Sequence, residues 1–440
     1  MPRVDFSNSI TTMAPEPVHA ARGGGSCLVL TGLSLDNLAV SRHGIYQRFR
    51  MLLEAAAEAG LTLELVCAEG RVVAADVPDA CVRLEAEVLE HWGLTCKVLA
   101  IGRVVKDSRT PYVLQQLGAC ISYAWSPGHR SAKAGGQLTQ LRHAMAQRHS
   151  LMLVHRLGSM ALVLDCPPSL PCVFDMDDVE HVVHTRRMDL GGSLRDRVLA
   201  RAALPALKRL ERAAVRRAAL TLVCAADDAK LVQDLAGVAE TRVAVVPNGV
   251  AMAQPRSPEP NANPVLLMVG IYGYEPNAEG ARYFIDQVWP SVRRALPNAE
   301  VWFVGGSPQS IGEPDHMPEG VKLLGFVDDI EAVYASASVV ICPILTGGGT
   351  RVKLIEAAVR EKAIVSTTVG AEGLGFVDGA HALLRDDADG FASACVQLLQ
   401  FPQLNRQMGQ EVRHLAANRY DLDRIRRGLA ERLRAVMLPT

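Results

Sequence analysis

The chain has 440 residues, of which 49% are hydrophobic and 21% charged, and its formal net charge is -1. This length is sufficient for two α/β domains. A charge so close to zero gives no global field that would attract nucleic acid. No apolar run approaches the ~18 residues of a membrane-spanning helix. The composition therefore predicts a soluble, two-domain protein that does not bind nucleic acid.

Residues 1–25 contain three prolines and the glycine triplet Gly23–Gly25, and they lack the apolar stretch of a secretory signal. We interpret them as a disordered tail. The 10 cysteines form no CxxC pair, and several lie in apolar, strand-like runs where a free thiol behaves as a small hydrophobe. Both features predict a cytoplasmic location.

In the first half, short apolar runs alternate with helical stretches, a pattern typical of parallel sheets covered by helices. Between about residues 72 and 148 the pattern is too vague to assign elements. Elsewhere it predicts, in chain order, a strand at 27–30, a helix at 46–59, strands at 61–67, 151–154 and 172–174, a helix at 193–219, and strands at 220–224 and 243–246. Residues 26–250 are therefore predicted to form one Rossmann-like domain.

Residues 251–264 carry four prolines and predict a linker. The alternation then resumes, which predicts a second domain over residues 265–420. Its expected elements are a strand at 265–269, a helix from about 278, strands at 301–304 and 321–324, a helix at 330–335, a strand at 338–342, a helix from about 352, a strand at 363–366 and terminal helices. The fold class is α/β, with two doubly wound Rossmann-like domains facing a central cleft.

The C-terminal stretch 421–440 is predicted to be a helix that could pack back on the N-terminal domain. It carries five arginines between residues 424 and 434. A solvated face partly paired with Asp423 and Glu431 explains them. A weak peripheral membrane contact is the alternative.

The most informative segment is residues 346–356, with the sequence TGGGTRVKLIE, which follows a predicted strand and opens a helix. Its glycines let backbone N–H groups approach a ligand, and the helix start adds a partial positive charge. Arg351 and Lys353 place two cations in the first turn, where the interaction of each with the helix dipole is unfavourable by ~0.3–1 kcal/mol. A ligand with two or more negative charges, such as a diphosphate, would offset that cost.

Glu356 lies further along the same helix, where its carboxylate could accept hydrogen bonds from the hydroxyl groups of a ribose. The alternative is a simple Gly-rich turn with exposed charges, because most such loops are only turns. The combination of strand, glycines, cations, helix and glutamate favours a ligand site. Its predicted members are Gly347, Gly348, Gly349, Thr350, Arg351, Lys353 and Glu356.

Two polar segments of the first half also follow predicted strands. The loop after the first strand contains Arg42, His43 and Gly44 just before a helix, and it is either a substrate contact or an exposed polar loop. Residues 175–181 read DMDDVEH and hold four carboxylates in six residues, so some should have raised pKa values or cationic partners. Strand ends that face a crevice bind ligands in such folds, although Asp177 could simply cap the next helix.

Several motifs together resemble glycosyltransferase family 4, a family of retaining enzymes with the GT-B architecture. The resemblance covers most of residues 170–400 and is looser before them. The motifs that carry it are residues 246–250 (VPNGV), 324–329 (LGFVDD), 347–356 (GGGTRVKLIE), 362–367 (KAIVST) and 370–374 (GAEGL).

The resemblance implies that Glu356 binds the donor ribose and that the loop 347–350, with Arg351 or Lys353, holds the pyrophosphate. The family often has a glutamate at the position of Gly348. It also often has an Arg and a Lys after the first strand of this domain, where this chain has a loop with Tyr272, which we assign to the donor site.

In the N-terminal domain the resemblance assigns Arg42, His43 and Gly44 to an acceptor or phosphate loop. Asp177 stands where the family often has a histidine, so Asp177 is the expected catalytic residue, with His181 one turn later as a substitute. Asp175 and Asp177 also form the Asp-x-Asp of a different, metal-dependent glycosyltransferase fold, but the duplicated domain layout argues against that interpretation. The pair His181 and His184 lacks a third ligand, so no metal site is expected.

The implied function is the transfer of a sugar from a UDP- or GDP-sugar to a hydroxyl of a saccharide or glycolipid acceptor. Retention of the anomeric configuration, no required cofactor or metal, a role in polysaccharide or glycoconjugate assembly and a place at the inner face of the membrane follow from the same resemblance. A GT-B epimerase or phosphorylase-like enzyme is one alternative. A non-catalytic sugar-nucleotide-binding protein is another, because Gly348 replaces the usual glutamate.

Overall fold

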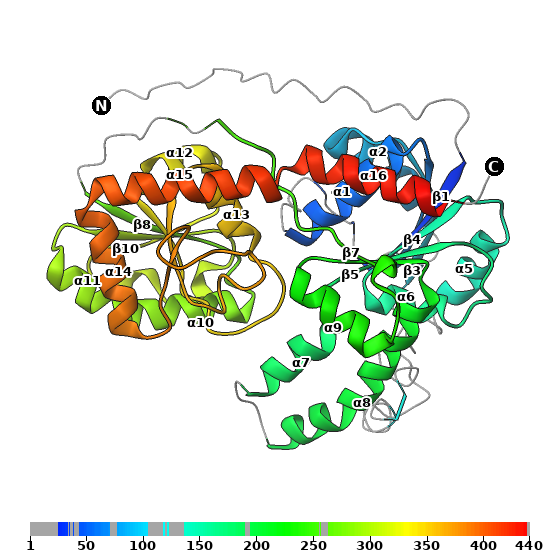
Figure 1. The fold of residues 1–440 in the computed structure, drawn as a ribbon, viewed down its shortest axis with the longest axis horizontal. Coiled ribbons are helices and arrows are strands. Elements are labelled where there is room, and N and C mark those ends of the chain that lie inside the picture. Colours follow the sequence, from blue (N-terminus) through cyan, green and yellow to red (C-terminus); the bar gives the residue numbers. More distant parts are fainter. Residues whose placement is uncertain are drawn as a thin grey trace.

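The computed structural model describes residues 25–33, 44–70, 77–103, 136–189, 194–254 and 263–437, together with the single positions 35, 38, 118, 121, 122 and 256. Residues 1–24 of the tail predicted at 1–25, and the two loop residues Arg42 and His43, lie outside this part of the chain. Two parallel sheets form two lobes that stand side by side (Figure 1).

The sheet of the N-terminal lobe has the strand order β3-β2-β1-β4-β5-β6-β7, and all its pairings are parallel. Its central strands are buried on both faces, which is why they appear in the sequence as continuous apolar runs. The strands are β1 (Ser26–Thr31), β2 (Thr62–Gly70), β3 (Cys96–Arg103), β4 (Leu151–His155), β5 (Cys172–Asp177), β6 (Leu220–Val223) and β7 (Val243–Val245).

Helices cover both faces of this sheet, because alternate residues of a strand point to opposite sides. In β1, Cys27 and Val29 belong to the core under α1 and α2, whereas Leu28 and Leu30 belong to the core on the other face. The helices are α1 (Gly44–Glu58), α2 (Val77–Trp92), α5 (Gln137–Met145), α6 (Leu157–Val163), α7 (Glu180–Asp189), α8 (Leu194–Arg217) and α9 (Ala226–Ala236).

The sheet of the C-terminal lobe has the order β10-β9-β8-β11-β12-β13, again entirely parallel. Its strands are β8 (Val265–Val269), β9 (Glu300–Val304), β10 (Val321–Gly325), β11 (Val339–Cys342), β12 (Ala363–Ser366) and β13 (Leu383–Leu384). Its helices are α10 (Glu275–Tyr283), α11 (Trp289–Ala295), α12 (Ile330–Ser336), α13 (Val352–Val359), α14 (Ala388–Gln400) and α15 (Pro402–Arg419).

The last helix, α16 (Leu422–Val436), returns to the N-terminal lobe and packs on α1 (Figure 1). Arg426 of α16 lies 2.9 Å from the Glu58 carboxylate of α1. The two chain crossings between the lobes are paired: Val250 N–H donates to Tyr420 O at 2.8 Å, and Leu422 N–H donates to Val250 O at 3.2 Å. The two covalent crossings between the lobes therefore lie side by side.

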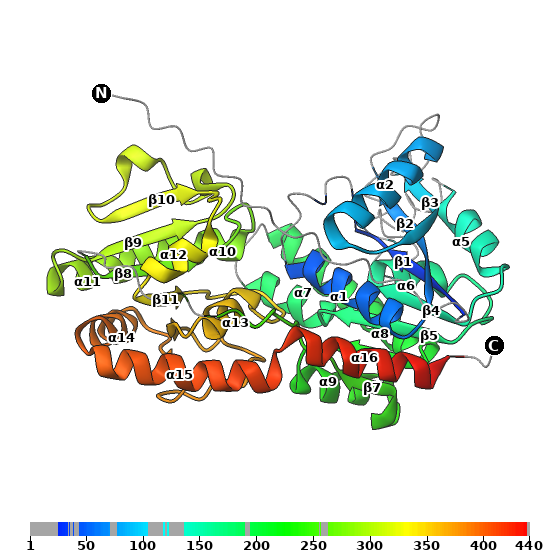
Figure 2. The same cartoon turned by 90° about the horizontal axis from the view of Figure 1, so that it is seen from above.

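In each sheet the strand order reverses direction once, between β1 and β4 and between β8 and β11. Ligands of doubly wound folds bind outside the carboxyl ends of the strands at such points. Helices α1 and α13 begin at the two reversal points and meet at the boundary between the lobes (Figure 2), where a Cβ on Gly44 would lie 3.2 Å from Val352 Cγ2. The functional site is expected there. Within the described residues, no helix has the length and apolarity needed to cross a bilayer.

Candidate functional site

The glycine-rich loop joins β11 to α13 and faces the N-terminal lobe. Gly347 (φ 111°) and Gly349 (φ 72°) adopt left-handed backbone conformations that other residues rarely adopt. A Cβ on Gly348 would lie 2.3 Å from Val183 Cγ2 of α7, and one on Gly349 would lie 2.3 Å from an Asp178 carboxylate oxygen. The loop therefore touches the opposite lobe so closely that, in this arrangement, a glutamate at position 348 would not fit.

Lys353, in the first turn of α13, lies beneath the loop that follows β8. Its ammonium donates to Asn277 Oδ1 at 2.7 Å, and Asn277 in turn donates to Ile271 O at 2.9 Å. Burial lowers the pKa of Lys353. In the described part of the chain no carboxylate oxygen comes within 4.0 Å of its ammonium. The charge of Glu356, one turn further along α13, favours the charged amine without forming an ion pair with it. A half-buried ammonium that lacks a contacting carboxylate favours an anion beside it.

Arg351 precedes α13 and shapes the glycine-rich loop. Its Nη1 donates to the carbonyl oxygens of Gly348 and Gly349. Its Nη2 is buried and has no hydrogen-bond partner among the described residues, and the guanidinium forms no ion pair there. Part of this side chain therefore fixes the loop, and one N–H group remains for a ligand.

Glu356 lies one turn beyond Lys353 and faces α1 of the other lobe. Burial raises the pKa of its carboxyl group, while Arg360 and a hydrogen bond with Gln47 of α1 act in the opposite direction. The carboxylate that sequence analysis assigned to a ribose thus has a partner across the lobe boundary.

A buried ion pair holds the N-terminal side of the site together. Arg48 of α1 is 2% exposed and Asp175 at the end of β5 is fully buried. The guanidinium donates to Asp175 from Nε at 3.0 Å and from Nη2 at 2.5 Å, and from Nη1 to Val246 O at 2.9 Å. Burial would lower the pKa of Arg48, but Asp175 raises it above its ordinary value. The two charges neutralise each other, so we assign this pair a structural role.

Asp177 ends β5 with a left-handed backbone (φ 57°), a conformation that costs free energy for a residue other than glycine. Its carboxylate lies 3.6 Å from Arg48 Nε and 3.9 Å from Arg156 Nε, and its side chain is 13% exposed. Asp177 therefore stands at the carboxyl edge of the sheet, where Arg48 and Arg156 balance its negative charge.

The acidic segment meets the expectation that its carboxylates have cationic partners or raised pKa values. Asp175 and Asp177 have arginine partners. Burial, and then repulsion from Asp177, raises the pKa of Asp178 to about 6.

His181 packs against α8. It is 7% exposed, its Nδ1 bonds to Glu211 of α8, and its backbone N–H donates to the same carboxylate at 2.9 Å. The Glu211 carboxylate thus binds both the backbone and the side chain of His181 in the first turn of α7. This placement gives His181 a structural role and argues against the catalytic role assigned from the sequence.

Two further residues differ from the sequence prediction: Tyr272 was assigned to the donor site, and His155 was not considered. Tyr272 is fully buried, and its hydroxyl donates to Met268 O at 2.8 Å, so its ring packs in the core and is not available to a donor. His155, at the end of β4, was not predicted. Its Nδ1 lies 3.2 Å from Thr31 Oγ1, and burial lowers its pKa to about 3, so the imidazole is neutral. A histidine directly after an apolar run was the signal available.

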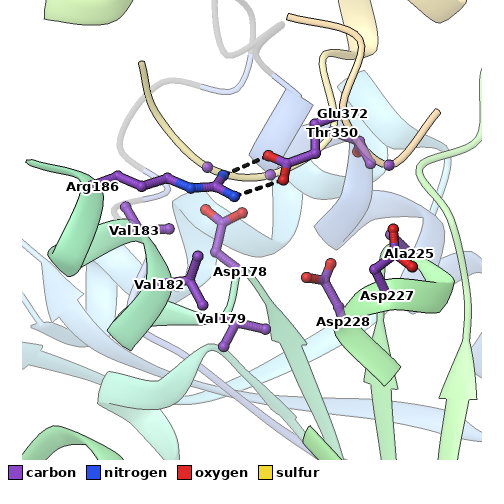
Figure 3. A pocket seen from close by; sticks show the side chains of 13 residues that line it. Asp178, Val179, Val182, Val183, Arg186, Ala225, Asp227, Asp228, Thr350 and Glu372 are labelled. Atoms are coloured by element: carbon purple, nitrogen blue, oxygen red, sulfur yellow. Dashed lines mark hydrogen bonds and ion pairs between the residues drawn. The ribbon is translucent and has the colours of Figure 1, made fainter. Parts of the chain in front are cut away.

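A small cavity lies between α7, the start of α9 and the glycine-rich loop (Figure 3). Arg186 of α7 bridges its mouth: it forms two bonds with Glu372, at 2.5 and 2.6 Å, and donates to Gly347 O at 3.1 Å. Figure 3 shows this pair above the Asp178 carboxylate. The cavity volume is about 50 Å³, room for a few waters but not for a sugar ring.

This cavity is acidic. Burial, and then repulsion from Glu372 and Asp227, raises the pKa of Asp228 to about 6. Among the described residues, no three His, Cys, Asp or Glu side chains gather in a way that could hold a metal ion. The lining residues are Asp178, Val179, Val182, Val183, Arg186, Ala225, Asp227, Asp228, Gly348, Gly349, Thr350, Glu372 and Gly373.

Comparison with known sequences finds similarity in the C-terminal half. Residues 263–400 match the family model described as Glycosyl transferases group 1. A stretch of 135 residues is 25% identical to a Klebsiella pneumoniae protein described as an uncharacterized 44.6 kDa protein in the cps region. That alignment covers 29% of this chain and 35% of the relative, so it spans about a third of the relative's length.

Solved structures resemble the chain over nearly its whole length. Sucrose-phosphate synthase from Thermosynechococcus elongatus has a TM-score of 0.66 at 15% identity, covering 94% of this chain and 99% of that one. Anabaena HepE in complex with UDP-glucose has a TM-score of 0.59 at 14% identity, covering 94% and 100%. WaaG, described as a glycosyltransferase involved in lipopolysaccharide biosynthesis, has a TM-score of 0.60 at 14% identity, covering 92% and 99%.

This likeness confirms the predicted fold class: the chain has the GT-B fold, with two Rossmann-like domains, and its C-terminal domain matches the Glycosyl transferases group 1 model.

Proposed function

We propose that this protein is a glycosyltransferase that moves a sugar from a nucleoside-diphosphate sugar to an acceptor hydroxyl. The observation that carries the proposal is Lys353, a half-buried cation beside a glycine-rich loop at the lobe boundary, whose ammonium forms no ion pair within 4.0 Å among the described residues. The match to Glycosyl transferases group 1 and the complex of a structural neighbour with UDP-glucose support the same conclusion.

The pyrophosphate of the donor would occupy the space at the starts of α1 and α13. Lys353 and the free Nη2 of Arg351 would face its oxygens, together with backbone N–H groups of the loop 347–350. Fixed donors and a helix start stabilise negative charge without reorganisation when it develops on a leaving group.

Glu356 would accept hydrogen bonds from the ribose of the donor. In our proposal the ribose hydroxyls take the place of its present partner, Gln47 of α1. Donor binding would therefore exchange a contact between the lobes for a contact with the nucleotide, which makes the relative position of the lobes sensitive to the donor.

In the reaction, the bond between the anomeric carbon and the β-phosphate oxygen breaks, and the acceptor oxygen bonds to that carbon. The acceptor proton leaves with the diphosphate or to solvent, so atoms and charge balance. Asp177 is the carboxylate placed at the strand edge to orient the reacting groups. Closure of the lobes would exclude water and limit hydrolysis of the donor.

The finer assignments are part of the proposal. They are a hexosyl donor carried by UDP or GDP, retention of configuration, no required cofactor or metal, and a saccharide or glycolipid acceptor at the inner face of the membrane. The cps-region relative and the lipopolysaccharide role of WaaG favour polysaccharide or glycoconjugate assembly. Arg42 and His43, which lie outside the described residues, are candidates for acceptor or phosphate contacts.

A thermal-shift screen with inorganic pyrophosphate, UDP, GDP and their sugars tests the donor site. A nucleotide at ~100 times its Kd should add about 2.7 kcal/mol to the free energy of unfolding. Product analysis with a labelled donor then separates transfer from epimerisation, and proton NMR of the product reads the anomeric configuration. Wild-type protein that binds none of these anions would overturn the proposal.

A further inference from the structure

Three side chains from three separate elements form a row from the buried core of the N-terminal lobe to the glycine-rich loop. Arg48 of α1 donates from Nη1 to Asn248 Oδ1 at 3.1 Å. Asn248 donates from Nδ2 to Thr350 Oγ1 at 2.8 Å. Asn248 lies in the chain crossing between the lobes, two residues before Val250, which pairs with Tyr420 of the returning chain.

The direction of each hydrogen bond in this row is fixed by chemistry. A guanidinium only donates, and Arg48 is held in place by Asp175. The carboxamide oxygen of Asn248 must therefore face Arg48, which leaves its NH₂ group to face Thr350. A carboxamide nitrogen only donates, so the Thr350 hydroxyl oxygen acts as the acceptor in this bond.

A hydroxyl that accepts one hydrogen bond still has its own hydrogen to donate. Within the described part of the chain, the Thr350 hydroxyl donates that hydrogen to no protein group. Thr350 follows Gly349 in the glycine-rich loop and stands immediately before Arg351 at the start of α13. Its hydrogen is thus available to an anion in the loop.

We propose that Asn248 is a positioning residue that acts through Thr350: it holds the hydroxyl of Thr350 as a hydrogen-bond donor to the diphosphate of the substrate. This inference rests on the proposed function, because it assigns a polar contact to the same site. It adds that the buried pair of Arg48 and Asp175, in the other lobe, determines which group donates and which accepts in the bond between Asn248 and Thr350.

The row also makes the contact depend on the arrangement of the lobes. Thr350 belongs to the C-terminal lobe, and Arg48 belongs to the N-terminal lobe. Asn248 stays near the crossing because the next residue, Gly249, is packed so tightly that a Cβ there would lie 2.8 Å from Leu422 Cα of α16. Rotation of the lobes away from this arrangement would break the bond to Thr350 and lower the affinity for the anion.

A double-mutant cycle tests the proposal. Isothermal titration measures the affinity of wild type, Asn248→Ala, Thr350→Val and the double variant for inorganic pyrophosphate, UDP and GDP. We expect each single change to lower the affinity for a bound probe about tenfold, the loss of one hydrogen bond to a charged group. If Asn248 acts through Thr350, the double variant also loses about tenfold. A loss near a hundredfold would show independent contributions and overturn the inference.

Asn248→Asp keeps the contact with Arg48 and covers the case in which the alanine variant fails to fold. A carboxylate can only accept, so it would take the hydrogen of Thr350, and the affinity should fall below that of Asn248→Ala. Adding Thr350→Val to Asn248→Asp should then change nothing. Thr350→Ser, which retains a hydroxyl, should keep the affinity near that of wild type. A purely structural role of Asn248 would give no such dependence on the hydroxyl.

Asn263→Ala is the matched control, since Asn263 makes one amide contact, with Glu300 at 3.1 Å, at the amino-terminal edge of the second sheet. It should leave all affinities unchanged. The outcomes separate the two proposals: wild type that binds no probe overturns the proposed function and this inference together, whereas binding by wild type with an additive cycle overturns this inference alone.

Discussion

Two cations on opposite sides of the lobe boundary, Arg48 and Lys353, differ in how their charge is compensated. In the N-terminal lobe, Arg48 is buried against Asp175, and each nitrogen of its guanidinium donates to at least one acceptor. In the C-terminal lobe, the half-buried Lys353 donates to the neutral Asn277, and Arg351 Nη2 has no hydrogen-bond partner among the described residues. A compensated charge serves the fold, whereas an uncompensated one predicts a ligand of opposite charge.

This contrast gives opposite expectations for removing each cation. Loss of the compensated arginine should harm stability whether or not a ligand is present. Loss of the uncompensated lysine should harm binding and leave stability unchanged or improved.

Arg48→Met should lower the free energy of unfolding by about 3–5 kcal/mol, because it leaves Asp175 buried without its partner. Urea denaturation followed by circular dichroism measures the change. Arg50→Met is the control on the same helix, since Arg50 forms an i,i+4 pair with Glu54 and is 38% exposed. Its cost should be about 0.3–0.5 kcal/mol. Equal costs for the two variants would contradict the assignment of Arg48 to the architecture.

Lys353→Met should weaken the binding of the nucleoside diphosphate by about 1.5–3 kcal/mol, the range for a hydrogen bond to a charged group. In the absence of ligand the same variant should be as stable as wild type or more stable, because burial disfavours the charged amine and lowers its pKa. Isothermal titration and thermal melting measure the two effects separately.

Lys322→Met is the control, since Lys322 is 48% exposed and pairs with Glu300 on the sheet. It should leave binding unchanged. A strong loss of ligand-free stability in Lys353→Met, without a change in affinity, would show that the amine serves the fold.

Much of the second lobe was predictable from the sequence. The strands at 265–269 and 363–366 have the predicted bounds, because buried parallel strands appear as unbroken apolar runs between helices. The glycine-rich loop was also predicted, since left-handed backbone at Gly347 and Gly349 demands glycine.

Other features depend on tertiary partners that no local pattern reveals. Between residues 72 and 148 the sequence analysis assigned no element, yet α2 buries Ala80, Leu84, Val88 and Trp92 at a spacing of four, and β3 pairs with β2. The exposed Val82 and Leu89 blur that stripe. Tyr272 and His181 appeared in polar segments, but a core carbonyl and the distant Glu211 determine their orientation.

The ion pair of Arg186 and Glu372 forms a clasp between the lobes, and its removal should have a smaller effect. Arg186 and Glu372 have side chains that are 35% and 43% exposed, so their pair is screened by solvent. Arg186→Gln should cost about 0.2–1 kcal/mol in thermal melting at low salt, and the difference from wild type should shrink as ionic strength rises. Glu372→Gln should show the same dependence, and the double variant should lose no more than either single one. A cost that does not change with salt would contradict an electrostatic clasp.

The smallest predicted effect concerns the acidic cavity and its dependence on pH. Burial and repulsion from Glu372 raise the pKa of Asp228 from 3.8 to about 6. A carboxyl group with a raised pKa in the folded state binds its proton more tightly there than in the unfolded chain, so its contribution to stability falls between about pH 4 and pH 6 and is constant above.

Asp228→Asn removes this contribution. The variant should therefore gain stability relative to wild type as the pH rises from 4 to 6.5, reaching about 0.5 kcal/mol after allowance for the partial exposure of the site. Thermal melting across this range measures the difference, with Asp234→Asn on the exposed face of α9 as the control. A difference that shrinks with rising pH would mean that the Asp228 carboxylate is stabilised by a cationic partner. Asp228 would then join the compensated charges that serve the fold, and the cavity would lose its excess of negative charge.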